Sequence, residues 1–284
     1  MAYPNLKQSV WLMVLFVVAT GILGLVLHFL GAESDNETRI FEYLGWILNL
    51  PVFAPLVLYA QRRSGRPWSD VLLLRTVPWK MYLPLTVSIL GFGIVISDVS
   101  TFVQYLIPIP KVYLDIFLDL MGSKTPLGLA FYVLAIHAPL TEEVLCRGVI
   151  LGGLLAHGTR RRAILWSAVL FAAMHMNPWQ FPGSLILGLV FAWWVVQTGS
   201  LLPALFGHAL NNFLSLISVR MELFRPIEDW GVVEFLPSWL FASGIVLAVI
   251  GLRWFHQMAK REGTPLEPQA GPQQAATPAA REPA

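Results

Sequence analysis

The sequence predicts an all-α protein that crosses a membrane about eight times, and three observations carry this prediction. Of the 284 residues, 56% are hydrophobic and only 13% are charged, a composition too apolar for a soluble globular domain. Several apolar runs approach the roughly 20 residues that a helix needs to cross a bilayer. Basic residues gather in alternate connections between these runs, which is typical of a polytopic membrane protein.

Eight apolar segments are interpreted as transmembrane helices. In chain order they are Val10–Leu30, Tyr43–Tyr59, Tyr82–Phe102, Pro126–Leu155, Ala163–Met176, Ser184–Val196, Leu201–Val219 and Phe235–Trp254. The second segment contains Pro51 and Pro55, which should kink it because proline removes a backbone donor. The fifth and sixth segments could instead be two shorter or partly re-entrant segments.

Two of the connections are amphipathic. Trp68 and Val71–Leu74 suit a short helix in the membrane interface, within a connection rich in Arg. Val112–Met121 has the same character, with Asp115 and Asp119 on its polar side. The sequence therefore predicts one short interfacial helix at Trp68–Leu74 and a second amphipathic segment at Val112–Met121, beside the eight spans.

The domain organisation is simple. We expect one transmembrane domain over residues 1–258, with a motif-bearing core over 125–219, and then a disordered cytoplasmic tail over 259–284, which is rich in Pro, Ala and Gln. Both termini are placed in the cytoplasm, because this orientation puts the Arg160–Arg162 cluster and most other basic residues inside. The missing organelle signals and the tail composition favour a bacterial inner-membrane protein.

Composition also excludes some classes of function. The formal net charge of +2 gives no indication of nucleic-acid binding. The single cysteine excludes an intrachain disulfide framework and an all-thiolate metal site.

Two adjacent carboxylates and an arginine interrupt the fourth apolar segment. Charges inside a transmembrane helix are costly and usually mark a functional site. Glu143 and Arg147 are four residues apart, so they can pair on one helical face. Glu142 is then left without a local partner, as a proton-transfer site requires.

Three further polar residues lie in later spans. His175 ends the fifth segment, one turn after Phe171. His208 and Asn212 are four apart on the seventh, so both point the same way. The depths of these residues are compatible with a single pocket shared with Glu142 and reached from the cytoplasm.

Chemistry offers two interpretations of this set. In the first, Glu142 and His175 activate a water that attacks a carbonyl carbon, while His208 and Asn212 donate to the developing oxyanion. In the second, Glu142, His175 and His208 hold a metal ion with an open position. We favour the first, because His-Glu-x-x-His is absent and a metal site gives Asn212 no necessary role.

The motifs Glu142-Glu143-x-x-x-Arg147, Phe171-x-x-x-His175 and His208-x-x-x-Asn212 resemble, in this order, those of the CAAX protease and bacteriocin-processing (CPBP, or Abi) family of intramembrane glutamate proteases. The resemblance implies an eight-helix intramembrane endopeptidase. It implies that Glu142 and His175 activate water, that His208 and Asn212 form the oxyanion hole, and that Glu143 and Arg147 support the site. Cys146 departs from the pattern, since the family often has an aromatic residue before Arg-Gly.

Other conspicuous residues have simpler structural interpretations. His137 is interpreted as a packing or access residue and Asn211 as an interhelical hydrogen-bonding residue. Asp98 could cap a helix end, and Cys146 is poorly suited to act as a nucleophile. The aromatic run Phe191–Trp194 is interpreted as a lipid-facing belt.

Together these features predict a metal-independent intramembrane endopeptidase without a cofactor. Its substrate would be a membrane-associated or lipidated peptide or protein that reaches the pocket from the membrane or the cytoplasm. A non-catalytic scaffold, immunity factor or transporter, or a metal-dependent protease, could use the same pocket. Family members in eukaryotes act on prenylated CAAX proteins, and bacterial members are tied to peptide maturation, secretion, bacteriocin immunity or signalling. Nothing in the chain chooses among these substrates.

Overall fold

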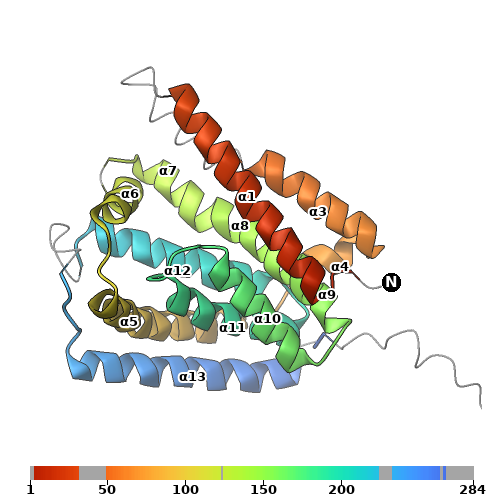
Figure 1. Ribbon diagram of the computed structural model, residues 1–284. Coiled ribbons are helices and arrows are strands. Elements are labelled where there is room, and N and C mark those ends of the chain that lie inside the picture. The colour runs from red at the N-terminus through yellow and green to blue at the C-terminus, as the bar shows by residue number, and fades with distance from the viewer. Residues whose placement is uncertain (1–2, 32–48, 123, 224–231, 263–264, 267–284) are drawn as a thin grey trace, which may run out of the picture.

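The computed structural model describes residues 3–31, 49–122, 124–223, 232–262 and 265–266, and in these residues the chain is helical and contains no strand (Figure 1). The elements are α1 (Leu6–Gly31), α3 (Leu50–Ser64), α4 (Trp68–Leu72), η1 (Trp79–Met81), α5 (Tyr82–Leu106), α6 (Lys111–Met121), α7 (Leu127–Phe131), η2 (Tyr132–His137), α8 (Ala138–Glu143), η3 (Val144–Leu151), α9 (Gly152–Leu155), α10 (Arg160–Ala173), α11 (Phe181–Thr198), α12 (Leu202–Arg220) and α13 (Ser238–Glu262). The predicted all-α class is confirmed.

Six stretches of the described chain are long and apolar enough to cross a membrane. They are Leu6–Leu27, Trp79–Leu106, Leu127–Leu155, Phe181–Thr198, Leu202–Arg220 and Ser238–Glu262. The chain is therefore an integral multi-pass membrane protein, as predicted.

The predicted number of eight spans is not confirmed. The helices at the second and fifth predicted spans, α3 and α10, have 15 and 14 residues, fewer than the roughly 20 of a full crossing. Pro51 lies in the first turn of α3, and residues 43–48 of the predicted second span lie outside the described residues. The chain leaves α10 after Ala173, and Met176 then adopts a left-handed φ of 46°.

The predicted tail begins within a helix. The last turn of α13 reaches Glu262, and Leu266 donates its backbone N–H to Val196 O at the end of α11. The rest of the predicted tail lies outside the described residues.

The fourth predicted span is one continuous helix with two widened stretches. The elements α7 to α9 follow each other without a break from Leu127 to Leu155, and η2 and η3 within them are π-helical. All eight residues of η3 are buried. Wide π turns displace the regular backbone hydrogen bonds and are frequent at functional sites. Glu142 and Glu143 lie between the two π stretches.

Helix α11 is the central helix of the bundle. It contacts α5, α10, α12, α13 and η3. Phe191 and Trp194 are both 0% exposed, and Trp193 packs its ring 5.2 Å from that of Phe255 on α13. The interpretation of Phe191–Trp194 as a lipid-facing belt was wrong, because a helix that is apolar all round can be surrounded by protein as well as by lipid.

Small residues allow α5 and α13 to pack closely and antiparallel along their length (Figure 1). A Cβ added to Gly91 on α5 would lie 2.3 Å from the backbone N of Ala248 on α13. Close approach at small residues is a common way for membrane helices to associate. Asp98 of α5 accepts a 2.8 Å hydrogen bond from the backbone N–H of Leu236, just before α13 begins, in keeping with a helix-end role.

Helix α4 forms where the sequence predicts a short interfacial helix, but one of its sides faces the protein. Val71 is 1% exposed, and its carbonyl oxygen would lie 2.4 Å from a Cβ added to Gly148 of the motif helix. Arg66 donates to the carbonyl of Gly148 over 3.2 Å and to that of Asp70. Gly148 is therefore required for the close approach of α4 to the motif helix.

Helix α6 forms at the predicted amphipathic segment Val112–Met121, and it has no buried residue. Its ends are tied to neighbouring spans. The Tyr113 ring packs 5.4 Å from that of Trp179, and Arg220 at the end of α12 donates over 2.6 Å to the carbonyl of Met121.

Candidate active site

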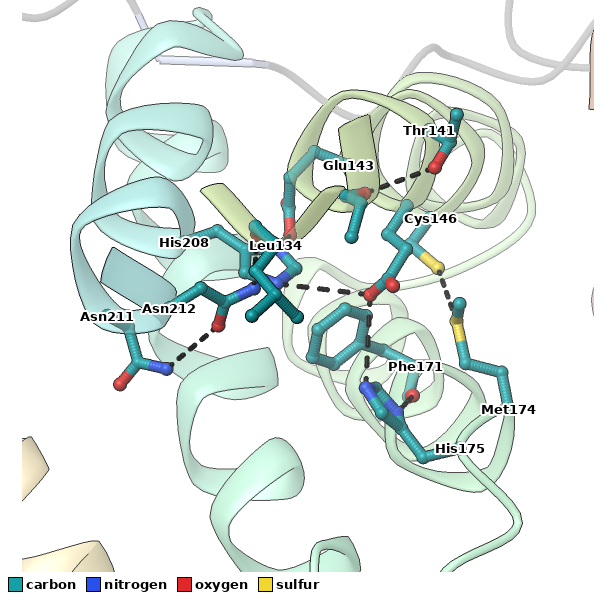
Figure 2. A network of polar contacts seen from close by, with 12 residues as sticks. Leu134, Thr141, Glu143, Cys146, Phe171, Met174, His175, His208, Asn211 and Asn212 are labelled. Carbon is teal, nitrogen blue, oxygen red and sulfur yellow. Dashed lines mark hydrogen bonds and ion pairs between the residues drawn. The ribbon is translucent and has the colours of Figure 1, made fainter. Parts of the chain in front are cut away.

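Three parts of the fold bring the predicted polar residues together. Glu142 and Glu143 are the last residues of α8, His175 follows the end of α10, and His208 and Asn212 lie on α12. Figure 2 shows the resulting network of polar contacts, in which His208 lies between the motif helix and the side chains of Phe171 and His175.

Glu143 is fully buried and joins two helices. Its Oε1 accepts a 3.0 Å hydrogen bond from Arg147 and a 2.9 Å hydrogen bond from Nδ1 of His208. The ion pair with Arg147 agrees with the prediction from their spacing. The bond to His208 was not predicted, and it makes Glu143 a link between the motif helix and α12.

Arg147 is also fully buried, and its positive charge is surrounded by a carboxylate, a backbone carbonyl and two aromatic rings. Besides Glu143, it donates to the carbonyl of Gly188 on α11 over 3.2 Å. Its guanidinium carbon lies 4.1 Å from the centre of the Phe171 ring and 5.8 Å from that of Phe191. Cation–π contacts are strongest in such desolvated positions.

His175 is held in one tautomer by its own helix end. Its Nδ1 lies 2.9 Å from the carbonyl oxygen of Phe171, and a carbonyl can only accept, so Nδ1 carries the proton. Nε2 lies on the other side of the ring, where it carries a lone pair when the ring is neutral, and Glu142 Oε2 lies 3.9 Å away. The Phe171 ring, 5.2 Å away and nearly perpendicular, supports this orientation.

His208 is packed between aromatic rings. It is 5% exposed, stacks on Phe191 at 5.7 Å with an interplanar angle of 26°, and meets Phe171 edge-on at 5.6 Å. Its Nε2 lies 3.9 Å from Glu142 Oε2. Phe191 is thus a site residue that sequence reasoning missed. Its helix is apolar on all sides, and this feature of the sequence could have predicted a central position in the bundle.

Glu142 is the point at which the two histidines converge. Its side chain is 17% exposed, and its buried Oε2 has no hydrogen-bond partner among the described residues. The two 3.9 Å separations are too long for direct hydrogen bonds. A water oxygen about 2.8 Å from each atom would bridge either gap. The sequence predicted that Glu142 faces His175, His208 and Asn212, and of these three the two histidines lie 3.9 Å from its Oε2.

Asn212 lies at the edge of this group and contacts the motif helix. Its Nδ2 donates a 2.9 Å hydrogen bond to the carbonyl of Leu134 in η2. Its Oδ1 accepts a 3.2 Å hydrogen bond from Nδ2 of Asn211, as Figure 2 shows. Among the described residues, Asn212 has no hydrogen bond to Glu142 or to either histidine.

Cys146 and His137 lie outside the convergence of Glu142 with the histidines. Cys146 is 0% exposed, and its Sγ lies 3.9 Å from Sδ of Met174 instead of facing a base. His137 is 4% exposed, and its Nε2 lies 2.6 Å from Oδ1 of Asn49, just before α3. His137, interpreted from the sequence as a packing or access residue, is thus buried and linked to the start of α3.

The metal-binding alternative finds no ready-made ligand set. In the described part of the chain, no group of three or more His, Cys, Asp or Glu side chains is arranged to hold a metal ion. Metal–ligand bonds of about 2.0–2.2 Å would draw Glu142 and the two histidines closer together than they lie here.

One comparison with known proteins gives a match. Residues 124–214 match a family model described as "Type II CAAX prenyl endopeptidase Rce1-like". The match covers 91 of the 284 residues and includes all three motifs, from Glu142 to Asn212. No curated protein and no solved structure matches the chain.

Proposed function

We propose that this protein, whose residues 124–214 match the CAAX prenyl endopeptidase family model, is an intramembrane endopeptidase whose general base is Glu142. The observation that carries the proposal is the convergence of His175 Nε2 and His208 Nε2 on the unpartnered Oε2 of Glu142, at 3.9 Å each. In the proposed mechanism, a water between Glu142 and His175 is oriented and deprotonated.

Hydrolysis would begin with this water. Its oxygen attacks the carbonyl carbon of the scissile peptide bond while its proton passes to Glu142, with the Nε2 lone pair of His175 accepting a second hydrogen bond from the same water. The tetrahedral oxyanion then collapses, the C–N bond breaks, and the proton held by Glu142 passes to the leaving nitrogen. The products are a carboxylic acid and an amine, and Glu142 is returned to its starting state.

His208 and Asn212 would stabilise the oxyanion. Because Nδ1 of His208 donates to Glu143, Nε2 can act as a donor only when the ring is a doubly protonated imidazolium. Glu143, which is bonded to both His208 and Arg147, and the nearby carboxylate of Glu142 would together offset the two positive charges. One N–H of Asn212 is bonded to Leu134, and the second is free to donate to the oxyanion.

The proposed substrate class is based on the position of Glu142. This residue belongs to a stretch long and apolar enough to cross a membrane, which favours a substrate that associates with the bilayer. We propose a membrane-associated or lipidated peptide or protein that reaches the site from the membrane or the cytoplasmic side. Both termini would be cytoplasmic, because this orientation places most Lys and Arg residues inside.

The decisive experiment is cleavage by the purified protein in lipid vesicles. The substrates are two peptide sets matched in sequence, one carrying a prenylated C-terminal CAAX motif and one unmodified but apolar. We expect cleavage by the wild type, none by Glu142→Gln, and wild-type rates for Glu262→Gln, the same change at an exposed residue at the end of α13. Full activity of Glu142→Gln would overturn the mechanism, and binding of either set without cleavage would favour a non-catalytic role.

A further inference from the structure

The side-chain amide of Asn212 has hydrogen bonds to two groups, the Leu134 carbonyl and the Asn211 side chain, which have no part in the mechanism proposed above. Leu134 O faces Nδ2 of Asn212 over 2.9 Å, and Nδ2 of Asn211 faces its Oδ1 over 3.2 Å. A backbone carbonyl can only accept, so Leu134 fixes which end of the amide is the nitrogen. The oxygen then points at Asn211, which must donate.

The Leu134 carbonyl can accept a hydrogen bond from Asn212 because the π-helical stretch leaves it without a backbone donor. In an α-helix this carbonyl would accept from the backbone N–H of Ala138, but that N–H bonds to Val133 O instead. The next possible donor along the π-helix is residue 139, which is a proline and has no N–H. The register of η2 and Pro139 together therefore leave the Leu134 carbonyl to Asn212.

We propose that Asn211 and the Leu134 carbonyl are positioning groups that hold the Asn212 amide with its second N–H directed to the reacting carbonyl. This inference rests on the proposed endopeptidase function. An amide turned by 180° would present its oxygen to the oxyanion and repel it. Asn211 acts through Asn212 and has no direct contact with substrate.

Asn211→Asp is the most informative variant. An ionised carboxylate at position 211 can only accept, so it should draw Nδ2 of Asn212 towards itself and turn Oδ1 towards Leu134 and the proposed oxyanion. We expect kcat to fall by about a hundredfold, as for loss of one oxyanion donor, with KM little changed. Asn211→Leu removes the donor without supplying an acceptor, so its kcat should fall by only about fivefold.

A double variant separates positioning from general damage to the fold. In an Asn212→Ala background there is no amide to orient, so adding Asn211→Asp should change kcat by less than about twofold. If the two losses multiply instead, Asn211 acts independently of Asn212 and the inference is wrong. If Asn212→Ala alone cleaves at the wild-type rate, the oxyanion assignment of the proposed function fails first.

Amide orientation can also be measured without turnover. Protein labelled with ¹⁵N-asparagine and ¹³C-carbonyl leucine, in bilayers, should show a solid-state NMR contact between an Asn Nδ2 and a Leu carbonyl that Asn212→Ala removes. We expect Asn211→Asp to remove the same contact. Its persistence in Asn211→Asp, with kcat within twofold of the wild type, would overturn the inference and leave the proposed function intact.

Discussion

Glu143 and His208 are joined by a 2.9 Å hydrogen bond between two helices, in a region from which solvent is almost excluded. The same carboxylate oxygen also accepts from Arg147. Oε2 of each of the two adjacent glutamates has no hydrogen-bond partner among the described residues, but Glu143 differs from Glu142 because its Oε1 is bonded to two side chains. This difference leads directly to a test.

Replacing Glu143 by Gln should affect the fold as well as turnover. The change leaves the buried guanidinium of Arg147 without its counter-charge, and breaking a buried pair in this way costs about 3–5 kcal/mol. Glu142→Gln should unfold at nearly the wild-type temperature. Thermal unfolding in detergent measures both variants. Equal destabilisation by the two changes would contradict the assignment of Glu143 as the structural link.

Asn212→Ala should lower kcat about a hundredfold with little change in KM, because an oxyanion donor acts mainly in the transition state. The measurement is steady-state cleavage of one peptide at several concentrations in lipid vesicles. Ser215→Ala, on the same helix, is the matched control and should cleave at nearly the wild-type rate, because among the described residues the Ser215 hydroxyl bonds only to the backbone carbonyl of Asn211. A rise in KM with unchanged kcat would mean that Asn212 binds substrate without stabilising the oxyanion.

Treatment with metal chelators distinguishes two mechanisms, one in which Glu142 and His175 activate the water and one in which a bound metal ion does so. We expect cleavage to continue after incubation with EDTA and 1,10-phenanthroline, because Glu142 and His175 can activate water without a Lewis acid. Loss of activity that returns on addition of Zn²⁺ would instead make Glu142, His175 and His208 ligands. A zinc metalloprotease assayed in the same vesicles shows that the chelators are effective there.

Two glycines on α5 form a matched pair for the packing against α13. A Cβ at Gly91 would lie 2.3 Å from Ala248 N, whereas a Cβ at Gly93 would meet nothing within 4 Å. Gly91→Ala should destabilise the protein by about 1–3 kcal/mol, as overpacking does. Gly93→Ala should be neutral or slightly stabilising. Unfolding in detergent compares the two, and equal stability would mean that α5 and α13 can separate at little cost.

The sequence could predict the members of the site because their identities and spacings are local properties. Glu143 and Arg147 are four apart, and His208 and Asn212 are four apart, so each pair shares a helical face. Which histidine meets which carboxylate depends on helix rotation, and sequence spacing does not fix rotation between helices. The bond from His208 to Glu143 was therefore outside the reach of the sequence.

Other features could not be predicted because they depend on what surrounds a helix in the folded protein. The apolar residues of α11 fit lipid or protein equally well, so Phe191 was taken for a lipid-facing residue although it stacks on His208. The register of η2 shifts by one residue relative to an α-helix, and hydrophobic periodicity does not resolve such a shift. The lengths of α3 and α10 are likewise shorter than their apolar runs suggested.

The burial of Cys146 gives the protein a practical advantage for chemical labelling. It is the only cysteine in the sequence and it is 0% exposed, so membrane-impermeant maleimides have no native thiol to reach in the folded protein. Cysteines introduced one at a time into the connections between spans can then be labelled from either side of a vesicle without first replacing Cys146. Such a map would assign each connection to its side of the bilayer, and with it the face from which a substrate approaches Glu142.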